Sequence, residues 1–180
     1  MVGVLGEENI VTLQTLHELG IRLNNHGEHE EARKVYERCL TARETVLGED
    51  HKDTLATVGN LGNVYDDLKD YEKALEYYER GLKGWKKTLG KTHPDTLQAV
   101  FSIALVYSSG FQDYGKAEEL YQRALEGFEA QLGKDHNSTK TCAMNLAVCF
   151  ARAGEKLKLR KIIDKYPHIL IDGPVLKKYL

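Results

Sequence analysis

The stretch "LGEDHKDTL", residues 47–55, returns as "LGKTHPDTL" at residues 89–97. Two looser copies, "LGEENIVTL" from residue 5 and "LGKDHNSTK" from residue 132, give steps of 42, 42 and 43 residues. A catalytic loop has no reason to recur at a fixed period, whereas a joint between structural repeats does. The stretch therefore predicts a repeat array.

The sequence between two joints predicts a pair of helices. In the second copy, Leu61 and Tyr65 lie four residues apart, and so do Ala74 and Tyr78 after a polar break at residues 69–70. Apolar residues at this spacing share one face of a helix. No segment alternates apolar and polar residues as a half-buried strand does, so we expect an all-α fold.

The joint itself predicts how one helix ends and the next begins. A glycine after leucine ends a helix by adopting the left-handed conformation, in which a Cβ would clash. Side-chain oxygens can then cap the following helix by accepting from its free N–H groups. At the matching positions the copies carry Asp53, Asp95 and Ser138, which we expect to be the caps.

The small and aromatic residues of these helices resemble tetratricopeptide repeats. The pattern is seen in Leu61-Gly62-x-x-Tyr65 with Ala74-x-x-x-Tyr78. The 42-residue period with its LG-x-x-H-P-D-T-L joint is similar to the kinesin light chain and nephrocystin-3 type. The resemblance implies a right-handed α-α superhelix, a single array over residues 1–180. Its repeats would span about 11–46, 53–88, 95–131 and 138–167, with a C-terminal cap or tail at 168–180.

Composition limits the classes of function. The chain has 180 residues, of which 42% are hydrophobic and 29% charged, and no apolar run reaches the roughly 20 residues of a membrane helix. Three cysteines make no disulfide framework and favour a cytoplasmic location. The net charge of −2 gives no reason to expect nucleic acid. We therefore expect neither a membrane nor a nucleic-acid partner.

Histidines are the residues that most invite a metal site. His51, His93 and His136 recur with the joint, but neighbouring helices lie about 8–10 Å apart, too far for three repeats to share one ion. A weak chelate at His26 and His29 is the alternative to an ordinary polar turn there. Since nucleophile motifs and phosphate-binding glycine loops are also missing from the sequence, we expect no enzyme, no cofactor and no metal.

The resemblance implies a groove lined by the first helix of each repeat. Shifting the core stripe by one or two residues predicts which positions face it. Four apolar candidates lie in the third and fourth repeats: Phe101, Leu105, Met144 and Val148. Four polar candidates lie in the first and second repeats: His17, Asn24, Asn63 and Asp66. The rival explanation is that the tail at 168–180, or a second copy in a dimer, covers the apolar stripe.

These observations favour a non-catalytic scaffold or adaptor that binds a peptide or short helix in the groove. Kinesin light chain-like cargo binding is what the resemblance implies. The alternative is a regulatory or oligomerisation arm of a larger NTPase or signalling protein. Leu5–Gly6 has the pattern of a second-helix end with no such helix before it, as in the middle of an array, and this favours the alternative. A homodimer or a place in a longer array is a further expectation.

Overall fold

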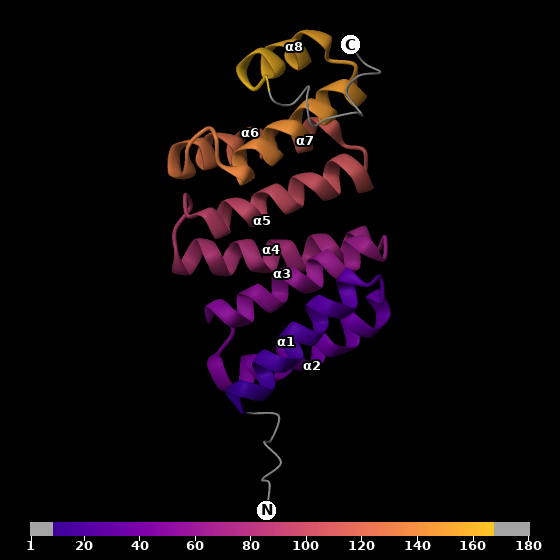
Figure 1. Cartoon of the computed structure of the whole chain (residues 1–180), viewed down its shortest axis with the longest axis vertical. Helices are drawn as coiled ribbons and strands as arrows, with labels where there is room; N and C mark the ends of the chain where they lie inside the picture. Colours follow the sequence, from indigo (N-terminus) through magenta and orange to yellow (C-terminus); the bar gives the residue numbers. More distant parts are fainter. Residues whose placement is uncertain (1–8, 168–180) are drawn as a thin grey trace, which may run out of the picture. The chain divides into compact units, whose positions relative to one another are not determined.

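The computed structural model describes residues 9–167, and every regular element in this part is helical. Successive helices form antiparallel pairs (Figure 1), which confirms the prediction of an all-α repeat fold. The chain divides into two compact units, residues 1–88 and 89–180. Unit 1 contains α1 (Ile10–Asn25), α2 (His29–Leu47), α3 (Lys52–Asp67) and α4 (Tyr71–Thr88). Unit 2 contains α5 (Pro94–Leu105), the π-helical turn η1 (Val106–Gly110), α6 (Tyr114–Leu132), α7 (Asn137–Ala153) and α8 (Lys156–Lys165).

The joint histidine caps each following helix. Backbone N–H groups two residues onward donate 3.2 Å hydrogen bonds to the Nδ1 atoms of His51, His93 and His136. The prediction that Asp53, Asp95 and Ser138 are the caps is therefore wrong, because each lies within the first turn and supplies the N–H group. The exchange is possible because imidazole Nδ1 is as many bonds from Cα as a carboxylate oxygen of aspartate.

The joint glycines also differ in detail from the expectation. Gly48 and Gly133 have φ angles of 89° and 87°, positive as predicted, but their ψ angles are 160° and 163°. This is an extended conformation at positive φ, which is almost closed to residues with a Cβ, and not the left-handed helical one. The turn is stabilised in unit 2 by two threonines. Thr96 donates to the carbonyl of Gly90 at 2.7 Å, and Thr139 donates to that of Gly133 at 2.8 Å.

Close contacts between small and aromatic residues hold the two helices of a pair together. Tyr36 of α2 lies against Gly20 of α1, where a Cβ would come within 2.7 Å of the ring. Tyr78 of α4 lies against Gly62 of α3 in the same way, at 2.6 Å. All four residues are buried. The small–aromatic pattern thus works as the sequence predicts, by letting the two backbones approach.

The single residue by which the third copy is longer is absorbed in η1. This turn directly continues α5 and contains five residues, Val106–Gly110. A π-helical turn is what results when one residue is inserted into an α-helix. Gln112, just beyond it, has a φ of 56° and completes the change of direction into α6. The insertion therefore stays local to the end of one helix.

Candidate functional site

His17, the first predicted groove residue, belongs to a polar network inside unit 1. Its Nδ1 accepts from Nη1 of Arg43 at 3.1 Å, and its other ring nitrogen lies 3.3 Å from the Asn60 amide. Arg43 is only 4% exposed and also donates to the Asp53 carbonyl at 2.6 Å and to Oγ1 of Thr57 at 2.7 Å. The network joins α1, α2 and α3, so it contributes first to the packing of these helices.

The other polar candidates are mostly engaged within unit 1 as well. Asn24 donates to Oδ2 of Asp67 at 2.9 Å and accepts from Nδ1 of His29 at 2.8 Å. Asn63 is exposed, and its Oδ1 accepts from the Tyr78 hydroxyl at 2.6 Å. Asp66 is half-buried, and this burial raises the pKa of its carboxyl.

The apolar candidates of unit 2 divide into one buried residue and three accessible ones. Phe101 is only 7% exposed and lies against the Tyr121 ring of α6, with the ring centroids 5.7 Å apart. Its expected exposure is therefore wrong, because an aromatic residue of the neighbouring helix covers it. Leu105, Met144 and Val148 are half-buried and keep part of their apolar surface open. A role in binding stays a prediction for these three.

The network around His17 predicts a dependence of stability on pH. Burial, and then the charge of Arg43, lower the pKa of His17 below its ordinary 6.5, against the weaker opposing effects of Asp53 and Glu18. Below pH 6.5, His17 therefore binds a proton more readily in the unfolded chain than in the folded chain. The free energy of unfolding falls as the pH falls from 6.5 towards the lower pKa of the folded chain. We expect the loss to be small, because the ring is only half-buried and solvent screens its charge.

Urea unfolding at pH 7.5 and pH 5.0 measures this effect when wild type is compared with His17→Gln. The glutamine amide can still accept from Arg43 but does not titrate. Between pH 7.5 and pH 5.0, the wild type should lose more unfolding free energy than His17→Gln. A constant difference across the range would show that His17 takes up a proton as easily folded as unfolded.

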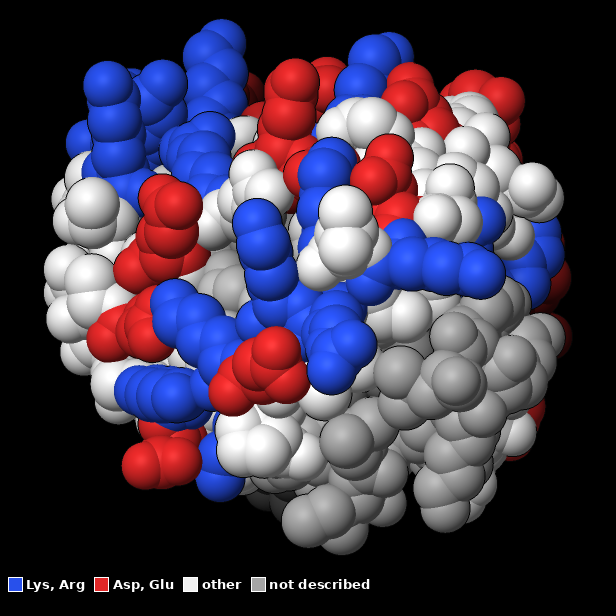
Figure 2. All heavy atoms as spheres, turned by 90° about the horizontal axis from the view of Figure 1, so that it is seen from above, with Lys and Arg blue, Asp and Glu red and all other residues white. Residues whose placement is uncertain are grey.

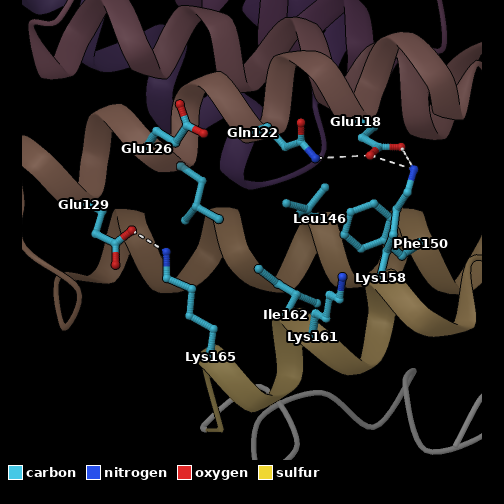
Figure 3. Close-up of a pocket in the computed structure, with 11 residues that line it drawn as sticks. Glu118, Gln122, Glu126, Glu129, Leu146, Phe150, Lys158, Lys161, Ile162 and Lys165 are labelled. Atoms are coloured by element: carbon cyan, nitrogen blue, oxygen red, sulfur yellow. Dashed lines mark hydrogen bonds and ion pairs between the residues drawn. The ribbon is translucent and has the colours of Figure 1, made fainter.

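A cleft of about 450 Å³ lies elsewhere in unit 2, between α6 and α8 (Figure 3). Its floor is apolar and is formed by Leu125, Leu146, Phe150 and Ile162. This volume is within the range of ligand pockets in proteins. The groove prediction concerned only the first helix of each pair, whereas two second helices form the walls here. Sequence reasoning therefore missed this site.

Charged residues of opposite sign face each other across the cleft. Lys158 pairs with Glu118 at 2.8 Å, and Lys165 pairs with Glu129 at 2.7 Å. The hydrogen bond from Lys165 lowers the pKa of Glu129. Between these bridges, Lys161 projects from α8 (Figure 3) and has no ion-pair partner among residues 9–167. The cleft thus combines an apolar floor with a cation available to a ligand.

The helix α8 gives this end of unit 2 its basic character. Its ten residues, "KLKLRKIIDK", contain five basic and one acidic side chain. Figure 2, which views the chain from this end, shows many Lys and Arg side chains with Asp and Glu among them. The surface is therefore mixed in sign, with local pairing, and not a uniformly cationic patch of the kind that binds nucleic acid.

Metal-binding clusters and membrane-spanning helices are absent from the described part of the chain. Across residues 9–167, His, Cys, Asp and Glu nowhere form a group of three or more that could hold a metal ion. No helix in this range is both long enough and apolar enough to cross a bilayer. Cys39, Cys142 and Cys149 are free and buried, and burial raises the pKa of all three thiols, so they pack as apolar residues.

Comparison with known proteins supports the repeat assignment. The sequence profile of the tetratricopeptide repeat matches residues 11–87, 60–130 and 110–158. A Podosopora anserina protein described as a kinesin light chain with nearly identical TPR-like repeats shares 23% identity, with a TM-score of 0.77 over 93% of this chain and 76% of that one. BtubC (BKLC) from P. vanneervenii shares 19% identity, with a TM-score of 0.79 over 90% of this chain and 65% of that one. No curated protein matches the sequence.

Proposed function

Because the chain belongs to the tetratricopeptide repeat family, whose repeats generally mediate protein–protein interactions, we propose that it is a non-catalytic adaptor of the kinesin light chain-like kind. It binds a peptide or short helix on the first helices of unit 2. The observation that carries this proposal is the partly open apolar surface of Leu105, Met144 and Val148. A cytoplasmic location agrees with the three free, buried cysteines.

The chemistry of these three side chains suits a peptide anchor. Methionine is flexible and polarisable, so it adapts to different apolar side chains, and leucine and valine give a firm surface beside it. A side chain buried in such a contact contributes about 1.5–3 kcal/mol before ordering costs. Two anchors of this size supply about 3–6 kcal/mol, whereas micromolar binding requires about 8 kcal/mol, so a third anchor or further contacts along the peptide must contribute.

Peptides selected against the wild-type chain from a phage-displayed random library provide the test. Met144→Glu combined with Val148→Glu should weaken their binding at least tenfold, because two charges would then face apolar anchors. Ala130→Glu combined with Gln131→Glu is the matched control, since it makes the same charge change at exposed positions of α6. Circular dichroism should show unchanged helix content in both. Equal affinity of the selected peptides for both double variants would place the binding surface elsewhere.

A further inference from the structure

The two units repeat the same arrangement, which allows a position-by-position comparison. The helices α2, α3 and α4 begin at residues 29, 52 and 71, and α6, α7 and α8 begin at residues 114, 137 and 156. The offset is a constant 85 residues. Each residue that lines the cleft between α6 and α8 therefore has a counterpart between α2 and α4 of unit 1.

In unit 1, an aromatic side chain lies at the counterpart of the cleft. Tyr77 of α4 stacks on Tyr65 of α3, with the ring centroids 5.3 Å apart and the planes at 14°. The ammonium group of Lys73 lies 5.1 Å from the same Tyr65 ring. Burial is the main reason that the pKa values of both tyrosines are raised. In unit 1, the Tyr65 ring of α3 is therefore in contact with both an aromatic ring and a cation from the second helix α4.

Unit 2 keeps part of this arrangement but not the stacked ring. Phe150 replaces Tyr65, and Lys158 lies 5.7 Å from its ring as Lys73 does in unit 1. The bridge between Glu129 and Lys165 takes the place of the bridge between Glu44 and Arg80. The counterpart of Tyr77, however, is Ile162, which has no ring to lay on Phe150. The cleft therefore includes the place that an aromatic ring occupies in unit 1.

The charge at the edge of the cleft differs between the units in a way that bears on the ligand. Lys161 stands where unit 1 has Glu76, and it has no ion-pair partner among the described residues. A carboxylate close to the aromatic group of a ligand would pair with it. Glu126 on the α6 side would disfavour a second carboxylate there, so the position of the acidic group is restricted.

We propose that the cleft between α6 and α8 binds a tyrosine or phenylalanine side chain of a partner protein, with a neighbouring aspartate or glutamate paired to Lys161. The incoming ring stacks on Phe150, as Tyr77 stacks on Tyr65 in unit 1. This goes beyond the proposed function, because the groove lies on first helices and this site lies between second helices. Either of the two proposals can be wrong while the other is right.

The probe for the test is 3-(4-hydroxyphenyl)propionate, which is a tyrosine side chain joined to a carboxylate. In titrations of the full ¹⁵N-labelled chain, it should shift amide resonances of α6, α7 and α8 around Phe150 and Ile162. Its analogue 4-ethylphenol, which has the ring without the carboxylate, should shift the same resonances with several-fold weaker affinity. Shifts confined to the first helices, or no shifts at millimolar probe, would overturn the proposal.

Two variants of α8 test the two halves of the recognition. Ile162→Tyr should supply the missing ring from within the chain, abolish probe binding and raise the melting temperature. Lys161→Glu should weaken the propionate at least threefold and leave 4-ethylphenol unchanged. Lys156→Glu, at an exposed position of α8 that does not line the cleft, is the matched control and should change neither affinity more than twofold. Should Ile162→Tyr fail to fold, the Lys161→Glu result decides alone.

Other occupants of the cleft have distinct signatures in the same experiments. If Ile162→Tyr shifts resonances of residues 168–180 without any probe, the chain's own tail is the occupant. If it converts a dimer into a monomer in sedimentation velocity, a second copy is the occupant. Either result overturns the proposal of a separate partner. The phage-selected peptides of the groove test should bind Ile162→Tyr as well as wild type, which keeps the two sites distinguishable.

Discussion

Replacement of Arg43 by alanine is expected to lower the free energy of unfolding by about 2–4 kcal/mol. The guanidinium is almost fully buried and donates to His17, to the carbonyl of Asp53 and to Thr57, so it joins three helices. Alanine removes these charge-assisted bonds and leaves both a cavity and acceptors without a donor. Chemical denaturation monitored by circular dichroism measures the loss.

Lys34→Ala is the control for this prediction. Lys34 is an exposed cation on the same helix, α2, and surface changes of this kind usually alter stability by less than about 0.5 kcal/mol. If Arg43→Ala costs no more than Lys34→Ala, the network does not hold the helices together. The comparison also separates the loss of a positive charge from the loss of a buried one.

Gly62→Ala is expected to destabilise the chain by about 1–3 kcal/mol although alanine is the better helix former. The added methyl group would lie 2.6 Å from the Tyr78 ring, well inside contact distance, so ring or backbone must move. The neighbouring Tyr65 and Tyr77 rings lie on α3 and α4 as well, and they limit how far the helix pair can open. Thermal and urea unfolding both report the change.

Gly59→Ala, three residues away in the same helix, should have the opposite effect. No atom lies within 4 Å of the position of its new methyl group, so only the helix propensity changes, by about 1 kcal/mol in favour of alanine. The two single-methyl variants thus differ in sign because of one neighbouring ring. If both variants shift stability in the same direction, the close approach of α3 and α4 is not what limits residue 62.

The fold was predictable because its determinants are periodic in the sequence. The recurring joint and the small–aromatic pairs, such as Gly62 with Tyr78, act between residues close in the chain and repeat at nearly constant steps. The general preference of helix caps for aspartate and serine does not predict the caps of this chain, because the side chain of His51 has the same reach. The repeat pattern and the helix caps are both local interactions. The positions of the helix starts were therefore predictable, and only the identity of the capping side chain was not.

The groove was harder to predict because exposure depends on residues from other helices. Phe101 has the helical phase of a groove residue, but Tyr121 covers it from α6. His17 has the same phase, but Arg43 reaches it from α2. At the position of Arg43, repeat 2 has Trp85 and repeat 3 has Phe128. The repeat pattern therefore does not predict a buried cation at this position.

An alignment of the second helices shows the two substitutions that distinguish the cleft, but not what they mean. Such an alignment places Ile162 under Tyr77 and Lys161 under Glu76. Neither substitution has a meaning by itself, because isoleucine and lysine are ordinary residues in a helix. Their importance comes from the stacked pair of Tyr65 and Tyr77, which only the structure reveals.

The π-helical turn η1 has a consequence for how a chain of this kind can change in length. An inserted residue rotates everything after it by about 100° when a helix remains α-helical, which would turn buried faces outward. The wider turn at Val106–Gly110 takes up that rotation before α6 begins. Ala117 and Tyr121 of α6 are therefore still buried. Helix ends next to a turn therefore act as places where insertions are tolerated, and the angular phase of later repeats is preserved.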